Sequence, residues 1–459
     1  MHQLIVSHFG YIENYVFITI QEKNCCIIDC FILAYRENLS NGVIFMMRYG
    51  LIGEKLGHSF SKIIHEKLAD YTYDLIPLSL EELDVFMREK AFSAINVTIP
   101  YKETVIPYLD EIDPKAAKMG AVNTIVQRNG KLFGYNTDYF GFRYMLEHNH
   151  IQIAGKKVLV LGRGGASKAV IAVLEDMGAA EIHTIYYKIA ENTISYETCY
   201  ALHTDAQVIV NTTPVGMYPN SGKTPIDLAP FTKLEAVADV VYNPLRTRLV
   251  LDALEKGCQA IGGLEMLVGQ AKYAVEIFLD QSLPDNAIEL VHNELMAERR
   301  NLVLIGMSGC GKTTLGKLAA EKLGKTFVDT DAEIIKRIGM SIADYFAAYG
   351  EDSFRQVESE VIQEISTQNN LVISTGGGVI KNPENIRWLK GNGTVIWIQR
   401  DPELLESGNG RPLVPDQDAV RRLYKERLPL YTAAAETIIE NNENEEKALQ
   451  KILTAFQQA

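Results

Sequence analysis

The chain has 459 residues, of which 47% are hydrophobic and 22% charged. This composition is ordinary for a globular protein and excludes collagen-like, low-complexity and wholly disordered chains. At roughly 150 residues per domain, the length predicts two or three domains. The formal net charge of -13 would repel a nucleic-acid backbone, so we expect no nucleic-acid partner.

The six cysteines form no CxxC pair and are too few for a disulfide framework. Their usage predicts a reducing compartment, the cytoplasm. Charged residues interrupt the apolar stretch near the N-terminus, and the first ten residues lack the basic start of a signal peptide. We therefore expect neither membrane insertion nor export.

Residues 1–45 contain strand-like runs but no motif that we can assign. Met46 and Met47 directly precede a new strand-turn pattern, so we predict that 1–45 are an extension outside the folds that follow. A packed accessory element is the alternative. From about residue 46 onward strands and helices alternate, which predicts an α/β architecture.

A strand over 156–162 leads into the turn GRGGAS at 162–167 and then into an amphipathic helix that ends near Gly178. This order is typical of a dinucleotide-binding βα unit, although an ordinary βα turn is the alternative. The residues predicted to approach the dinucleotide are Gly162, Gly164, Gly165, Ala166 and Ser167.

The next strand, over 181–187, ends at Tyr187 and Lys188 instead of at an acidic residue. An acidic side chain at this place would bind the ribose hydroxyls of NAD, whereas a base suits the 2′-phosphate of NADP. We therefore predict NADP(H) as the cofactor, with Lys188 in contact with the phosphate.

A third strand, Asn301–Gly306, leads into GMSGCGKTT, which matches the phosphate-loop pattern GxxxxGK[ST]. Backbone N–H groups of such a loop surround phosphate oxygens, the lysine carries charge to the β and γ phosphates, and the hydroxyl after it binds Mg²⁺. The predicted ATP-binding residues are Gly306, Gly309, Cys310, Gly311, Lys312, Thr313 and Thr314, with Thr313 also on the metal.

Asp329 and Asp331 follow the next strand, and their i, i+2 spacing places both carboxylates on one side of an extended segment. One can hold metal-bound water while the other accepts a substrate proton; Asp331 is also a possible N-cap of the following helix. A later strand runs into the loop Gly376–Gly378, which suits close approach of a substrate.

The motifs GMSGCGKTT, FVDTD, FRQVE, TGGG, RPL and ERLPLY occur in the order of shikimate kinase, which residues 300–459 resemble. The resemblance implies a P-loop, nucleoside-monophosphate-kinase-like α/β domain. It implies the following roles: base and hydroxyl binding for Asp331, Mg²⁺ support for Asp329, carboxylate binding for Arg355 and Arg427, substrate contact for Gly377 and Gly378, and catalysis for Lys312 and the lid residue Arg411. Glu406 and Ser407 stand where the family usually has a further arginine against adenine.

Residues 47–298 resemble shikimate dehydrogenase through HSFSKIIH, NVTIPYK, GAVNTI, GYNTD, NTTPVGM, DVVYNP and GGLEMLVGQ. The resemblance implies substrate contacts for Ser59, Ser61, Thr98, Asn123, Asp138, Tyr242 and Gln270, a cofactor contact for Gly263, and Lys102 with Asp138 as the catalytic pair. An ammonium can stabilise and protonate the alkoxide that hydride addition creates, and a carboxylate can orient that ammonium. Lys62 replaces a usual proline, and YYK replaces the usual Asn-Arg-Thr segment at the 2′-phosphate.

We therefore predict three parts: an extension (1–45), a dehydrogenase (46–298) and a kinase (300–459). Within the dehydrogenase, an α/β substrate domain (about 46–150 and 262–298) encloses a Rossmann domain (about 151–261). The predicted function is NADPH-dependent reduction of 3-dehydroshikimate to shikimate, followed by phosphorylation with ATP and Mg²⁺. The alternatives are an NAD-dependent quinate/shikimate dehydrogenase fused to the kinase and a regulator without activity. Small-molecule substrates are the predicted partners, with no obligate protein partner.

Overall fold

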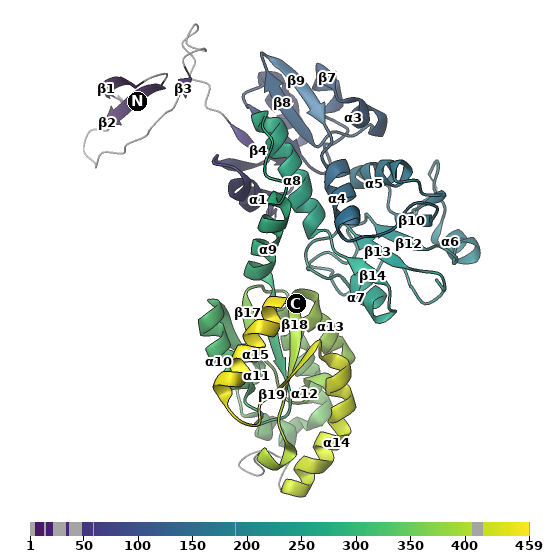
Figure 1. Ribbon diagram of the computed structural model, residues 1–459, viewed down its shortest axis with the longest axis vertical. Helices are drawn as coiled ribbons and strands as arrows, with labels where there is room; N and C mark the ends of the chain where they lie inside the picture. The colour runs from purple at the N-terminus through teal and green to yellow at the C-terminus, as the bar shows by residue number, and fades with distance from the viewer. Residues whose placement is uncertain are drawn as a thin grey trace.

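The computed structural model describes residues 5–12, 15–21, 34–35, 48–57, 59–188, 190–405 and 416–458. Three α/β domains form two lobes, and the second domain is inserted within the first along the chain (Figure 1). We call them the N-terminal domain (48–148 with 264–299), the middle domain (157–261) and the C-terminal domain (300–458). The α/β class predicted from the alternation of strands and helices is confirmed.

The N-terminal domain is built on a mixed sheet. Its strands, in sheet order, are β5 (Tyr73–Pro77), β4 (Tyr49–Gly53), β6 (Ala94–Val97), β8 (Thr124–Arg128), β9 (Lys131–Tyr135) and β7 (Glu111–Ile112). β4 pairs in parallel with β5 and β6, whereas β8 is antiparallel to β6 and β9. The helices are α1 (Ser61–Leu68), α2 (Leu80–Glu89), α3 (Pro114–Met119), α4 (Asp138–His148), α8 (Leu264–Leu279) and α9 (Ala287–Arg299), with the 3-10 turn η2 (Ile106–Tyr108).

The middle domain is a parallel sheet in a doubly wound arrangement. Its strands, in sheet order, are β11 (Glu181–Ile185), β10 (Lys157–Leu161), β12 (Val208–Asn211), β13 (Ala236–Asp239) and β14 (Gln259–Ile261). Its helices are α5 (Gly165–Asp176), α6 (Tyr196–Leu202) and α7 (Arg248–Glu255). The near-continuous apolar runs of β10 and β12 are buried, as expected where helices cover both faces of a parallel sheet.

The C-terminal domain has a second parallel sheet. Its strands, in sheet order, are β16 (Thr326–Asp329), β17 (Leu371–Ser374), β15 (Asn301–Ile305), β18 (Gly393–Gln399) and β19 (Thr437–Glu440). Around them lie α10 (Lys312–Leu323), α11 (Thr330–Ile338), α12 (Ile342–Ser366), α13 (Pro383–Asn392), α14 (Gln417–Ala434) and α15 (Glu445–Gln458), with the turns η3 (Val379–Lys381) and η4 (Pro402–Leu404). Trp397 of β18 is fully buried and stacks on Tyr431 of α14.

Helix α9 joins the two lobes (Figure 1). Its apolar residues recur at helical spacing, and Ile288, Val291 and Leu295 are buried. At its last residue, the Arg299 guanidinium lies 3.4 Å from the centre of the Phe60 ring in the N-terminal domain. The Arg300 side chain donates instead to the Phe456 carbonyl in the C-terminal domain, at 2.5 Å. Consecutive arginines therefore contact different lobes at a short junction.

Three strands precede these domains: β1 (Ile5–Ile12), β2 (Tyr15–Gln21) and β3 (Ala34–Tyr35). They form a sheet of their own in the order β1-β2-β3, with antiparallel pairing. The sheet is drawn away from the two lobes in Figure 1. That residues 1–45 are a separate extension stays a prediction.

Candidate active sites

A cavity of about 420 Å³ lies between the N-terminal and middle domains. It is lined by the residues predicted to act on one substrate, which are Ser59, Ser61, Thr98, Lys102, Asn123, Asp138, Tyr242 and Gln270. Ala166 and Gly263, which were predicted to contact the cofactor, also line it. The structure thus gathers into one space side chains that are up to 211 positions apart, since the set runs from Ser59 to Gln270.

The sheet topology explains why these residues meet. β4 and β6 are parallel, so the segments that follow them, with Ser59 and Lys102, leave the same edge of the sheet. β8 is antiparallel to β6 and therefore starts at this edge, which places Asn123 there. β9 is antiparallel to β8 and therefore ends at this edge, where Asp138 begins α4 three residues after Tyr135.

Lys102 and Asp138 form an ion pair in this cavity, with 2.5 Å between Nζ and Oδ2. The lysine side chain is 14% exposed and the carboxylate 9%, so both are shielded yet open to the cavity. The other carboxylate oxygen, Oδ1, accepts from Asn123 Nδ2 at 2.9 Å. Asp138 is therefore held in place on both oxygens and can orient the ammonium of Lys102.

The glycine-rich turn of the middle domain approaches this pair. A Cβ at Gly165 would lie 3.1 Å from Lys102 Cδ, so a larger residue would press on the lysine. Gly162 has φ +104, which a glycine adopts without strain. The Ser167 hydroxyl is buried and donates to the Gly164 carbonyl at 2.6 Å. A dinucleotide on this turn would therefore lie directly beside Lys102.

The end of β11 differs from its prediction, because the strand ends at Ile185 and the chain bends at residues 187 and 188. The Lys188 ammonium lies 5.1 Å from the centre of the Tyr187 ring, which is 70% exposed. A hydrogen bond to Tyr187 raises the pKa of Tyr186, whereas the positive charges of Lys188 and Arg163 act to lower it. Lys188 and Arg163, the latter from the glycine-rich turn, therefore lie near Tyr186.

A buried polar network lies behind the cavity. Tyr73 donates to Asn96 Oδ1 at 2.7 Å, and Asn96 lines the cavity and donates to Thr124 Oγ1 at 3.0 Å. His65 stacks on Tyr73, with 4.0 Å between ring centres, and its Nδ1 lies 2.8 Å from the Tyr71 hydroxyl. Burial lowers the pKa of His65 to about 3, so the ring is neutral at physiological pH.

Because His65 is buried and neutral, we expect the folded protein to lose stability in acid. Between pH 6.5 and about 3 the unfolded chain binds a proton at His65 that the folded chain does not, so the free energy of unfolding falls as the pH falls through this range. From pH 7 to 5 the expected loss is about 2 kcal/mol. Urea unfolding followed by circular dichroism at both pH values should show a flatter pH dependence for His65→Gln. The same slope in both proteins would contradict the assignment.

The second candidate site is the loop between β15 and α10. Lys312 begins α10, is buried, and donates to the carbonyls of Gly306 and Met307, each at 2.9 Å. Thr313 donates to Asp329 Oδ2 at 2.9 Å. This strand-loop-helix arrangement directs backbone N–H groups of the loop and the helix start toward one point, which suits a phosphate.

Asp329, and not Asp331, caps helix α11, which corrects the alternative considered from the sequence. The Asp329 Oδ1 atom accepts from the backbone N–H groups of Asp331 and Ala332. Asp329 has extended backbone, as an N-cap residue typically does, whereas Asp331 already lies within the helix. Burial and the nearby Asp329 charge raise the pKa of Asp331, which makes it a better proton acceptor.

The loop Gly376–Gly378 lies against polar side chains of three helices. A Cβ at Gly376 would lie 2.6 Å from Asp331 Oδ1, and one at Gly378 would overlap the Arg355 guanidinium. Arg427 donates to the Gly377 carbonyl at 2.8 Å, and its Nε is buried without a partner among the described residues. This unpaired N–H group can donate a hydrogen bond to an anionic ligand.

Two family models match the chain. The shikimate dehydrogenase substrate binding domain model matches residues 51–125, and the shikimate kinase model matches residues 308–457. The shikimate dehydrogenase (NADP(+)) of Clostridium beijerinckii is 39% identical over 267 residues, which are 54% of this chain and 98% of that protein. This chain belongs to the shikimate dehydrogenase family.

Solved structures agree with this assignment. Shikimate dehydrogenase 1 from Peptoclostridium difficile is 36% identical, with a TM-score of 0.51 over 55% of this chain and 98% of that one. The shikimate 5-dehydrogenase of Thermus thermophilus, solved in complex with NADP(H) and shikimate, is 30% identical, with a TM-score of 0.50 over 54% of this chain and 99% of that one. The protein is an enzyme that joins a shikimate dehydrogenase to a shikimate kinase domain. Both resemblances inferred from the motifs are confirmed.

Several polar residues of the shikimate dehydrogenase part were not selected from the sequence. Asn96 lies inside the motif NVTIPYK and lines the cavity; Lys55 also lines it, near the start of the segment with Ser59. Arg163 stands inside GRGGAS. Their motifs were the available signal, but the contacts of these residues arise only in the fold.

In the shikimate kinase domain, Glu358 was also missed. It is buried and accepts from Arg355 Nη1 at 2.8 Å, and burial raises its pKa. It therefore fixes the arginine that faces the Gly376–Gly378 loop. Arg411 lies outside the described residues, as do Glu406 and Ser407, so its predicted place in a lid stays a prediction.

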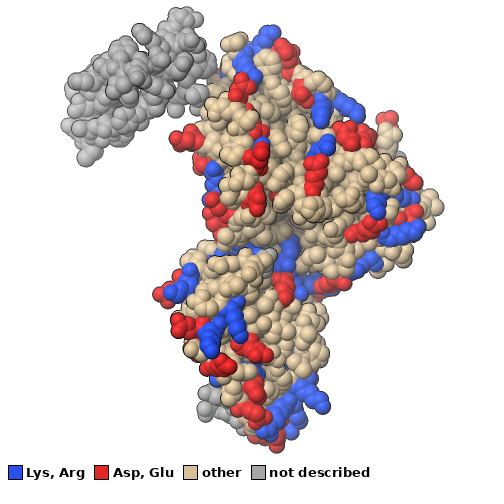
Figure 2. All heavy atoms as spheres, viewed as in Figure 1, with Lys and Arg blue, Asp and Glu red and all other residues tan. Residues whose placement is uncertain are grey.

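The described surface carries charges of both signs. On the face shown in Figure 2, acidic and basic side chains are interspersed, and basic ones also occur at the waist between the lobes. Within the described ranges, no helix combines the length and apolar character needed to cross a bilayer. The same residues contain no cluster of three or more His, Cys, Asp or Glu side chains suited to a metal ion.

Proposed function

We propose that this enzyme reduces 3-dehydroshikimate to shikimate with NADPH and then phosphorylates shikimate to shikimate 3-phosphate with ATP and Mg²⁺. The observation that carries the proposal is the Lys102–Asp138 ion pair in a cavity that also contains Ser59, Ser61 and Gln270. The relatives named above support it, since one is called NADP(+)-dependent and another was solved with NADP(H) and shikimate. The product of the first site is the substrate of the second.

In the reduction, the cofactor supplies a hydride to the ring ketone carbon. Lys102 then donates a proton to the ketone oxygen, so that the alkoxide does not accumulate, and Asp138 keeps the ammonium directed at that oxygen. Ser59 and Ser61, whose hydroxyl oxygens are 3.1 Å apart, are placed to hold the substrate carboxylate. Lys55 lines the same cavity and adds positive charge for that anion.

For the cofactor, we propose that Lys188 and Arg163 together bind the adenosine 2′-phosphate of NADPH. Both cations act electrostatically on Tyr186, which supports a shared role for them. Within the described part of the chain, the Lys188 ammonium lies over the Tyr187 ring and interacts with Tyr186 and Tyr187. Gly162, Gly164, Gly165, Ala166 and Gly263 would lie along the rest of the dinucleotide.

Removing Lys188 tests cofactor choice. We expect Lys188→Ala to raise the Michaelis constant for NADPH about five- to a hundred-fold, the range for loss of a charged hydrogen bond. The constant for NADH should barely change, because NADH lacks the 2′-phosphate. Initial rates with each cofactor at saturating 3-dehydroshikimate measure both values. An equal loss with both cofactors would mean that Lys188 supports the structure and does not read the phosphate.

In the phosphorylation, Asp331 accepts the proton of the attacking shikimate hydroxyl, and the raised pKa of its carboxyl favours this role. Mg²⁺ prefers hard oxygen ligands, and the Thr313 hydroxyl and Asp329 carboxylate, 2.9 Å apart beside the phosphate loop, match that preference. When bound, the ion neutralises phosphate charge. Gly306, Gly309, Cys310, Gly311, Lys312 and Thr314 would hold the ATP phosphates.

The kinase also has to hold the shikimate carboxylate. We assign this to Arg355 and Arg427, because arginine meets a carboxylate with two parallel hydrogen bonds and Arg427 Nε has a free donor among the described residues. Gly377 and Gly378 let the ring approach the loop backbone. Arg411 stays the predicted lid residue, and its positive charge would stabilise the transferring phosphoryl group. Since the proposed substrates are small molecules, we also propose that the enzyme is cytoplasmic and requires no obligate protein partner.

A coupled assay tests the proposal directly. The full chain is mixed with 3-dehydroshikimate, NADPH, ATP and Mg²⁺, and loss of NADPH absorbance and formation of shikimate 3-phosphate are followed together. Both should proceed, and omitting ATP should stop the second step alone. Reactions with quinate and NAD⁺ test the alternative substrate. Oxidation of quinate with NAD⁺ faster than of shikimate with NADP⁺ would contradict the proposal.

A further inference from the structure

The backbone segment 242–247 lies between the dehydrogenase cavity and the kinase domain. Tyr242 and Asn243 line the cavity that contains Lys102. Only two residues later, Leu245 and Arg246 form hydrogen bonds with the kinase domain. One short segment is therefore part of the wall of one active site and part of the interface between the lobes.

The kinase side of this interface is the end of helix α13. Leu245 N–H donates to Asn392 Oδ1 at 2.9 Å, and Arg246 N–H donates to the Gly391 carbonyl at 2.8 Å. The Arg246 guanidinium donates to the carbonyls of Lys390 and Gly393, at 2.9 and 2.5 Å. The last carbonyls of a helix lack partners within it and carry negative partial charge, so a cation suits this place.

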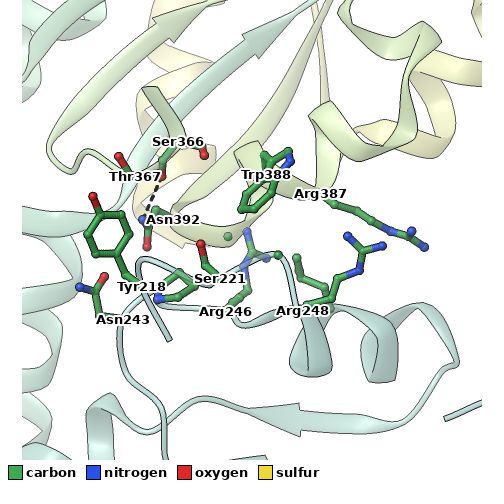
Figure 3. A pocket seen from close by; sticks show the side chains of 14 residues that line it. Tyr218, Ser221, Asn243, Arg246, Arg248, Ser366, Thr367, Arg387, Trp388 and Asn392 are labelled. Carbon is green, nitrogen blue, oxygen red and sulfur yellow. Dashed lines mark hydrogen bonds between the residues drawn. The ribbon is translucent and has the colours of Figure 1, made fainter. Parts of the chain in front are cut away.

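Further contacts hold Arg246 and Asn392 in this arrangement. The third guanidinium nitrogen of Arg246 pairs with Glu436, 2.8 Å away, and the arginine side chain is only 29% exposed. Asn392 is buried, and its Nδ2 donates to the Ser366 carbonyl at 3.0 Å, which fixes the oxygen that receives Leu245 N–H (Figure 3). In the same interface Trp388 packs where a Cβ at Gly222 would lie 2.7 Å from the indole.

The dehydrogenase holds the two ends of the segment. At one end Val241 accepts from Gly263 N–H at 2.9 Å, and at the other the Thr247 hydroxyl donates to the buried Asp239 at 2.6 Å. In the middle, Asn243 accepts from Tyr218 N–H at 3.0 Å, which links it to another cavity-lining residue. The N–H groups of Leu245 and Arg246, by contrast, donate to the kinase domain.

We propose that Arg246 and Asn392 are positioning residues for the reductase: the kinase domain holds segment 243–246 and thereby sets the cavity wall formed by Tyr242, Asn243 and Tyr218. This inference rests on the proposed reduction of 3-dehydroshikimate in that cavity. It gives the kinase domain a role in the first reaction that is separate from phosphoryl transfer. Neither residue lines the cavity, so both act through the backbone between them and the cavity.

Full-length Arg246→Met and Asn392→Ala test the proposal. Each loses hydrogen bonds between segment 243–246 and the kinase domain, so the KM for 3-dehydroshikimate should rise about five- to thirty-fold. The kcat for reduction should change less than about two-fold, because Lys102 and Asp138 are untouched, and the KM and kcat for phosphorylation of shikimate should stay at the wild-type values. Arg246→Lys keeps a cation with three donors at the helix end and should recover part of the loss.

Arg387→Met is the matched control. Arg387 pairs with Glu255 across the same interface, at 2.7 Å, but Glu255 lies on α7 and outside the segment. Its loss weakens the interface without releasing segment 243–246, so KM for 3-dehydroshikimate should be unchanged. Circular dichroism and thermal unfolding identify any variant that does not fold, and Arg246→Lys then provides the comparison.

Two results would overturn the inference: a wild-type KM in both Arg246→Met and Asn392→Ala, or the same rise in KM in Arg387→Met. The second would mean that general stability of the interface, and not the held segment, matters. A wild-type chain that does not reduce 3-dehydroshikimate at all would instead contradict the proposed function. The two failures are therefore distinguishable.

Discussion

Lys102→Ala should lower the rate of 3-dehydroshikimate reduction by about 100-fold or more while ATP-dependent phosphorylation of added shikimate continues. The substitution removes the ammonium that lies 2.5 Å from Asp138, and with it the group that protonates the developing alkoxide. Asp138 would then lack its cation in a shielded cavity. NADPH absorbance and ADP release measure the two reactions on the same preparation.

Lys168→Ala is the control for this variant. Lys168 pairs with Glu103, the residue after Lys102, at 2.7 Å and donates to the Gly120 carbonyl, but it does not line the cavity. It should retain the wild-type reduction rate. Loss of phosphorylation in folded Lys102→Ala would show that the two sites do not act independently and would contradict the assignment.

Lys312→Ala should produce the opposite pattern, with phosphorylation about 100-fold lower or worse and reduction unchanged. Lys312 is 7% exposed and its ammonium lies at the phosphate loop, 2.9 Å from two loop carbonyls. Its removal takes away the charge that stabilises the transferring phosphoryl group. Lys317→Ala on the same helix, whose ammonium faces the Phe327 ring, is the control and should keep wild-type phosphorylation.

Mixing the two lysine variants extends this prediction. Lys312→Ala should supply shikimate and Lys102→Ala should phosphorylate it, so the mixture should make shikimate 3-phosphate after a lag set by shikimate accumulation. Free diffusion of the intermediate is enough for this result. A mixture that never forms the product, although each variant keeps its remaining activity, would show that shikimate is not released between the sites.

Features that depend on a short stretch of backbone were predictable from the sequence. The phosphate loop follows from glycines, a lysine and a threonine at fixed spacing after a strand, and α9 follows from the spacing of its apolar residues. The glycine-rich turn before α5 is of the same kind. Such patterns act through local hydrogen bonding and periodicity, which need no knowledge of the rest of the fold.

Roles that depend on competing local geometries were less predictable. Asp329 and Asp331 both fit the pattern of a helix cap, and only the backbone conformation assigns the cap to Asp329. The strand that was expected to reach Tyr187 ends at Ile185. Where a strand or helix begins depends on pairing and packing that a window of sequence does not contain.

The sequence by itself determined which chemical groups this protein has and, through two ordered sets of motifs, which families its two halves resemble. Only the tertiary structure decided which of those groups meet: Lys102 with Asp138 across 36 positions, and Arg246 with Lys390 near the end of α13 across 144 positions. Contacts of this range depend on how sheets, helices and domains pack against one another. Residues far apart in the chain leave no local signal of their distance, so the segment between the dehydrogenase cavity and the kinase domain could be found only in the folded molecule.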